Sequence, residues 1–95
     1  MARKETLMEE IKTFLNANLQ VISWPAKHAK KQAVIEYMAE KFEEGRTYTE
    51  SEVNEILNKF HTFNDPALLR RELFEKKFFD RDLNGGKYWK ISKLI

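Results

Sequence analysis

The 95-residue sequence predicts a single α+β domain in which about four helices precede a C-terminal β-hairpin. Apolar residues recur at helical spacing in four segments, three of which open with a helix-capping pattern. An Asn-Gly dipeptide then separates two short segments rich in aromatic residues, which is typical of a hairpin turn. This order of elements, with one short β segment before the last two helices, predicts a winged-helix-like fold, a helix-turn-helix followed by a β-hairpin wing.

The first predicted helix begins at a capping box formed by Thr6 and Glu9 and ends near Ala17. Its apolar stripe consists of Leu7, Ile11, Phe14 and Leu15. We interpret residues 1–18 as an N-terminal helical appendage and residues 24–91 as the winged-helix-like module, within one domain of residues 1–95. The stripe leaves two arrangements open: docking onto the module, which adds buried area to a small domain, or self-association into a homodimer.

A second helix is predicted from Lys27 to Glu44, because apolar residues keep helical spacing there and Gly45 is placed to end the helix. The β-leaning residues 46–48 follow. A third helix begins after Thr49, which opens a second capping box. Its predicted buried face consists of Val53, Ile56, Leu57 and Phe60.

A fourth helix is predicted from Pro66 to Lys77, because Asp65 can accept hydrogen bonds from free backbone N–H groups and proline suits the first helical position. In a winged helix this is the recognition helix. Two strands are expected at residues 78–81 and 87–91, so that the turn between them forms the tip of the wing.

Strand alternation requires that either Tyr88 or Trp89 faces the interior, and we expect Trp89 to do so. The predicted core consists of Ile35, Met38, Phe42, Val53, Ile56, Leu57, Leu69, Leu73, Phe79 and Trp89. An aromatic share of 13% is enough to fill such a core without a metal or a disulfide.

Composition excludes several classes of site. The chain has no cysteine, which removes disulfides, thiolate metal sites and cysteine nucleophiles. The two histidines, His28 and His61, have no metal-binding spacing, and no glycine-rich phosphate loop is present. We therefore expect no enzyme activity, no metal and no small-molecule cofactor. Charged residues interrupt the N-terminus, so we expect no signal peptide or membrane span and a cytoplasmic location.

Charge is distributed unevenly along the chain, although the net charge is only +2. Residues 1–58 carry 8 basic and 10 acidic side chains, a net charge of −2, whereas residues 59–95 carry 9 basic and 5 acidic side chains, a net charge of +4. A surface that meets a polyanion should therefore be built from the C-terminal part.

The fourth helix and the hairpin hold the candidate DNA-binding residues. With Leu69 and Leu73 facing the core, helical geometry points Arg71 away from it. An arginine in that position can pair with guanine in a major groove, while neighbouring cations meet phosphates. The candidates are Arg70, Arg71, Lys77, Arg81, Lys87 and Lys90, with Lys93 as a further cation on the hairpin strand. The opposing interpretation is that Arg70, Glu72 and Glu75 form ordinary ion pairs on a solvated helix face.

Three motifs carry a resemblance to a known family: Tyr48–Leu57, Leu69–Leu73, and Arg81 together with Gly86–Trp89. On these motifs the chain resembles a bacterial family catalogued as domain of unknown function 2087, from about Trp24 to Lys90. Similar modules occur attached to helix-turn-helix domains of the arsenical-repressor type. The resemblance therefore implies a link to transcription regulation and no named ligand.

Two functions follow as expectations. The first is a transcription-regulation module that binds duplex DNA weakly through the fourth helix and the hairpin. The alternative is a protein-interaction or dimerisation module with no DNA binding, since the module in the fused relatives can serve as an accessory element. The arginines of the Leu69–Leu73 motif fit both, because they can contact DNA or brace the fold through Glu50, Glu52 or Asp80.

Overall fold

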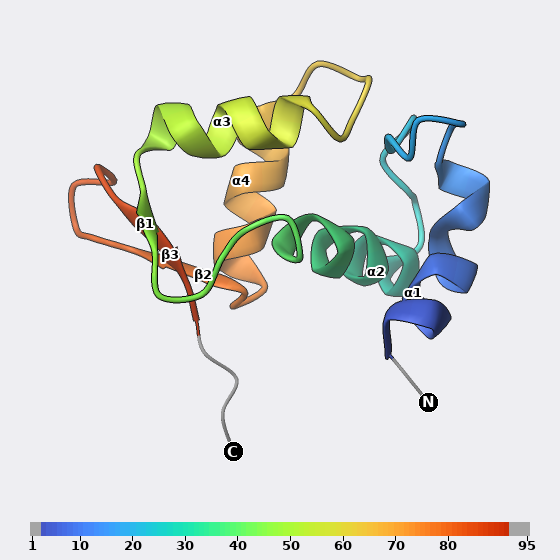
Figure 1. Ribbon diagram of the computed structural model, residues 1–95, viewed down its shortest axis with the longest axis horizontal. Coiled ribbons are helices and arrows are strands. Elements are labelled where there is room, and N and C mark those ends of the chain that lie inside the picture. Colours follow the sequence, from blue (N-terminus) through green and yellow to red (C-terminus); the bar gives the residue numbers. More distant parts are fainter. Residues whose placement is uncertain (1–2, 92–95) are drawn as a thin grey trace.

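The computed structural model describes residues 3–91 and, of these, the side chains of residues 5–91. It confirms the predicted α+β, winged-helix-like architecture, with helices packed on one side of a three-stranded antiparallel sheet (Figure 1). The helical elements are α1 (Arg3–Ile11), the 3-10 helix η1 (Lys12–Phe14), α2 (His28–Ala39), α3 (Glu50–Asn58) and α4 (Pro66–Glu75). The strands are β1 (Thr47–Tyr48), β2 (Phe79–Arg81) and β3 (Tyr88–Lys90).

The sheet has the strand order β1-β3-β2, so β3 is hydrogen-bonded on both sides. Tyr88 pairs with Tyr48 on one neighbour and with Arg81 on the other. Paired residues share a face of the sheet, and these three face the helices. The inward aromatic residue of β3 is therefore Tyr88, which is 2% exposed, and the expectation that Trp89 lies in the core was wrong.

The rest of the predicted core is largely confirmed. Ile35, Met38, Phe42, Val53, Leu57, Leu69, Leu73 and Phe79 are all buried, whereas Ile56 is only partly so. The Phe42 ring makes edge-to-face contacts with Tyr48 and Phe79, at centroid distances of 5.1 and 4.8 Å. These contacts join the end of α2 to the sheet.

Helix α2 ends at Ala39 rather than at the predicted Glu44. The chain tightens there, because the Phe42 N–H donates to the Ala39 carbonyl, three residues back, at 3.2 Å. The next backbone N–H, of Glu43, leaves the helical pattern and donates to the Tyr48 hydroxyl at 2.8 Å. This early exit directs the Phe42 ring into the aromatic contacts of the sheet, while Gly45 takes its left-handed conformation in the loop beyond.

Helix α1 docks on α2 and contributes Leu7 and Ile11 to the common core, both fully buried. The predicted capping box at Thr6 was wrong, because that residue lies inside the helix. The regular helix also ends earlier than predicted, at Ile11, and continues as η1. The connector that follows is fixed by Tyr37, whose hydroxyl donates to the Leu19 carbonyl at 2.7 Å. Burial, and secondly the charge of Glu40, raises the pKa of Tyr37.

The turn between α3 and α4 is held by a buried histidine. His61 is 4% exposed, and its Nε2 accepts a hydrogen bond from the Asp65 N–H at 2.9 Å. Its Nδ1 therefore carries the proton of the neutral ring and donates to the Leu57 carbonyl at 2.8 Å. Asp65 in turn caps α4 by accepting from the Leu68 N–H at 3.1 Å, as predicted. One ring thus links the last turn of α3 to the first turn of α4.

Replacing this ring by an isosteric apolar one should destabilise the fold. In His61→Phe the aromatic volume stays, but the partly buried Asp65 N–H loses its acceptor and the Leu57 carbonyl its donor, so we expect the free energy of unfolding to fall by about 1–3 kcal/mol. Urea denaturation measures the change. His28 is exposed, and His28→Phe should change stability by less than about 0.5 kcal/mol. Equal stabilities for the two variants would show that His61 does not hold the turn.

Candidate functional site

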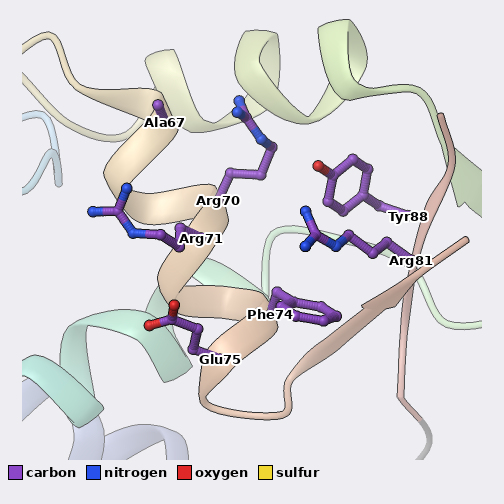
Figure 2. A pocket seen from close by; sticks show the side chains of 7 residues that line it. All are labelled: Ala67, Arg70, Arg71, Phe74, Glu75, Arg81 and Tyr88. Atoms are coloured by element: carbon purple, nitrogen blue, oxygen red, sulfur yellow. The ribbon is translucent and has the colours of Figure 1, made fainter. Parts of the chain in front are cut away.

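A groove of about 250 Å³ lies between α4 and the β2–β3 hairpin. Figure 2 shows its lining, which comes from α4 on one side and from the two hairpin strands on the other. The lining residues are Ala67, Arg70, Arg71, Phe74, Glu75, Arg81 and Tyr88. Three guanidinium groups and one carboxylate give the groove a net positive lining.

Arg81 reaches the groove because of the sheet register. It pairs with Tyr88 across the hairpin, which turns its side chain toward α4. Its guanidinium carbon lies 4.3 Å from the centroid of the Phe74 ring, so the cation is stacked on an aromatic face. Within residues 5–91 no carboxylate forms an ion pair with Arg81. Its hydrogen-bonding edge is therefore available to an anion.

Arg70 is held in place by α3. Its guanidinium donates to the Asn54 side-chain oxygen and lies 3.7 Å from a Glu50 carboxylate oxygen. The Arg70 side chain is 19% exposed, whereas that of Glu50 is 52% exposed, so solvent weakens the ion pair. Bracing through Glu50 is one of the roles expected from the sequence. These contacts fix the position of the Arg70 guanidinium group at the edge of the groove.

The other candidate cations are spread around this groove. Arg71, Lys77 and Lys87 are exposed, as expected for Arg71 from its position opposite the buried face of α4. Figure 2 shows the Arg71 side chain pointing away from Arg81, on the outer side of α4. Lys90 lies elsewhere, because its ammonium donates to the Phe42 carbonyl at 3.3 Å, beyond the end of α2. Lys93 lies outside the described residues.

Two acidic residues near these cations have partners within the fold. Glu72 forms an ion pair with Lys76 at 3.0 Å, with both side chains largely shielded from solvent. The Asp82 carboxylate accepts from the backbone N–H groups of Gly86 and Lys87, at 2.8 and 3.2 Å, and so organises the hairpin loop. Glu75 is the carboxylate that lines the groove. The predicted ion pairing on α4 is thus present for Glu72, but its partner is Lys76.

Tyr88 lines the groove but was not among the site residues predicted from the sequence. The side chain is 2% exposed, and its hydroxyl points into the groove in Figure 2. Among the described residues this hydroxyl has no hydrogen-bond partner. Side-chain alternation identifies it. Because Phe79 faces the interior, Arg81, two residues on, faces the same side, and Tyr88 shares that side because it pairs with Arg81.

The described part of the chain holds neither a cluster of metal ligands nor a membrane-spanning helix. Between residues 3 and 91, no group of three or more His, Cys, Asp or Glu side chains is placed to hold a metal ion. No helix in that range is long and apolar enough to cross a membrane.

Comparison with known families identifies a match over most of the chain. The model of the family described as "Uncharacterized protein conserved in bacteria (DUF2087)" matches residues 20–90, which include α2, α3, α4 and all three strands. Helix α1 precedes the matched region, although its side chains share the core. No curated protein and no solved structure matches the sequence significantly.

The end of α4 offers a direct test of local geometry. The Phe78 N–H donates to the Leu73 carbonyl and the Lys77 N–H to that of Phe74, the two bonds of a Schellman motif. This motif places Lys77 in the left-handed region, with φ of +70°. Glycine adopts this conformation without steric cost, so Lys77→Gly should raise the free energy of unfolding by about 0.5–1 kcal/mol in urea denaturation.

Lys76 provides the matched control for this substitution. Its φ is −88° and its ammonium pairs with Glu72, so Lys76→Gly should lower stability by about 1 kcal/mol. A loss of stability in Lys77→Gly as well would contradict the proposed end of α4.

Proposed function

This chain belongs to the bacterial family DUF2087, and from that premise we propose that it is a non-enzymatic module that binds duplex DNA weakly through α4 and the β2–β3 hairpin. The observation that supports this most is the arginine-lined groove where α4 meets the hairpin. A link to transcription regulation and a cytoplasmic location are parts of the same proposal.

The arrangement of elements supports a specific docking mode. In a winged helix the second helix of the helix-turn-helix enters the major groove and the hairpin lies over the adjoining backbone. Here α4 presents Arg71 on its exposed face, while Arg81 and Lys87 lie on the hairpin. Arg71 is then the residue placed to meet base edges, and the hairpin cations are placed to meet phosphates.

The charge balance of this surface also supports the proposal. Of the acids on this surface, Glu72 is paired with Lys76 and the Asp82 carboxylate accepts from backbone N–H groups, whereas Glu75 and Asp80 are exposed and would repel a phosphate. Lys77 adds a further cation to this surface. Its backbone is in the left-handed region, which glycine adopts with less strain than lysine. Such a position costs stability, which is consistent with a role for the side chain outside the fold.

A protein-interaction module is the second candidate. It is favoured by apolar side chains exposed on the connector before α2, where Leu19 is 50% and Ile22 is 46% exposed. Leu83 at the hairpin tip is fully exposed as well. Scattered apolar residues of this kind are common on monomeric proteins, so we rank this function second.

Fluorescence anisotropy with a labelled mixed-sequence duplex tests the DNA proposal. We expect affinity to fall as salt rises, with a dissociation constant of about 10⁻⁴–10⁻⁶ M at physiological salt. Lys87→Ala removes one phosphate contact and should lower the log–log salt slope by about 0.9 on every sequence. Arg71→Ala should cost about 1–3 kcal/mol on a preferred sequence that places a guanine beneath it.

Lys12 supplies the matched control for the loss of one positive charge. Its side chain is 66% exposed and it follows α1, at the end of the molecule opposite the hairpin (Figure 1). Lys12→Ala should leave both affinity and salt slope unchanged. If the duplex does not bind at low salt, or if Lys12→Ala weakens binding as much as Lys87→Ala, the DNA proposal fails and the protein-interaction module replaces it.

A further inference from the structure

We propose that the groove between α4 and the hairpin is a pocket for one phosphoryl group, held by Arg81, Arg70 and the hydroxyl of Tyr88. This deepens the proposed function and rests on it for the source of the phosphoryl group, which is the DNA backbone. A free phosphorylated molecule offers the same chemistry, and the experiment below separates the two sources.

The first observation is the unused hydroxyl of a buried tyrosine. Tyr88 is 2% exposed, yet its hydroxyl has no partner among the described residues and points into the groove. The other two buried tyrosines use their hydroxyls within the fold: Tyr37 donates to Leu19, and Tyr48 accepts from Glu43. The Tyr88 hydroxyl oxygen is not among the fully buried polar atoms, so it opens onto the groove and is free to hydrogen-bond to a group bound there.

The second observation is a pair of guanidinium groups on the same groove. In Figure 2 the guanidinium group of Arg81 lies next to the hydroxyl of Tyr88, while Arg70 extends toward α3 at the upper edge of the groove, so the three groups come from three different elements. Asn54 and Glu50 fix Arg70, and the Phe74 ring supports Arg81. Both side chains are thus ordered before a ligand arrives, which reduces the entropy lost on binding. Guanidinium groups with a hydroxyl donor match the oxygen atoms of a phosphoryl group.

The size and charge of the groove limit what it can hold. Its volume of about 250 Å³ is below the roughly 300–1,000 Å³ typical of sites for drug-sized ligands, so it suits a single small group. Glu75 lines the groove too and repels an anion, but in Figure 2 it lies on the far side of Phe74 from Tyr88. The anion is therefore expected at the end of the groove where Tyr88 and Arg81 meet.

Inorganic phosphate is the first probe, titrated into the full chain while NMR follows the arginine side-chain Nε–H signals. We expect saturable shifts at Arg81 and Arg70. Tyr88→Phe removes only the hydroxyl and should weaken phosphate binding about tenfold, as expected for one hydrogen bond to a charged group. Tyr48→Phe removes the same atom from the paired position in β1, where the hydroxyl is used within the fold, and should leave the affinity within about twofold.

The second probe is duplex DNA in which one phosphate at a time is replaced by a neutral methylphosphonate. If the backbone supplies the phosphoryl group, replacement at one position should weaken binding more than replacement at its neighbours, and Tyr88→Phe should abolish that difference.

The two probes together separate the two sources. If phosphate binds in a way that depends on Tyr88 but the duplex does not bind, the pocket is supported and assigned to a free phosphorylated molecule, and the DNA function is rejected. If the original chain binds the duplex, and Tyr88→Phe binds both phosphate and the duplex as the original chain does, the pocket is rejected and the DNA function is retained. If the original chain binds neither inorganic phosphate nor the duplex, both the pocket and the DNA function are rejected.

Discussion

The pairing of β3 between β1 and β2 decides which side chains of the hairpin meet α4. Because side chains alternate along a strand, the register that joins Tyr88 to Tyr48 and Arg81 sends all three toward the helices. A shift of β3 by one residue would put Trp89 in the place of Tyr88, opposite Tyr48 and Arg81. The Tyr88 hydroxyl in the groove depends on that register, and the stacking of Arg81 on Phe74 depends on the same alternation along β2.

A chain with a net charge of only +2 can still carry a positive site, because its charges are paired unevenly. Near the groove, Glu72 is paired with Lys76 and the Asp82 carboxylate accepts from backbone N–H groups, whereas Arg81 has no acidic partner within residues 5–91. The Glu50 carboxylate is half exposed to solvent, which weakens its ion pair with Arg70. Glu50 therefore helps to position the Arg70 side chain but offsets little of its positive charge. Local pairing, rather than overall composition, therefore determines the electrostatics of this surface.

Most of the fold could be predicted from the sequence where a local rule acts alone. The capping box at Thr49 and the Asp65-Pro66 start of α4 are both present, because capping involves only neighbouring residues. Predictions failed where distant contacts compete with local preference. Helix α2 ends early, and the Glu43 N–H donates to the distant Tyr48 hydroxyl instead of a helical carbonyl, while Thr6 does not cap α1 although its sequence pattern fits.

The candidate site was predicted only in part, for the same reason. The exposed position of Arg71 follows from helical periodicity, which the sequence displays. The side of the sheet occupied by Tyr88 and the diversion of Lys90 to the Phe42 carbonyl depend on strand register, which the sequence does not display. Arg70 shows the limit most clearly, since sequence left open whether it braces the fold or lines a site, and the structure has it doing both.

Amide chemical-shift mapping with a short duplex tests the central claim, that α4 and the hairpin form the binding surface. At low salt we expect the largest shifts on the exposed face of α4 and in residues 81–88, with α1 unaffected. The largest shifts on α1 or on the Leu19–Ile22 connector, or no shifts at all, would contradict it.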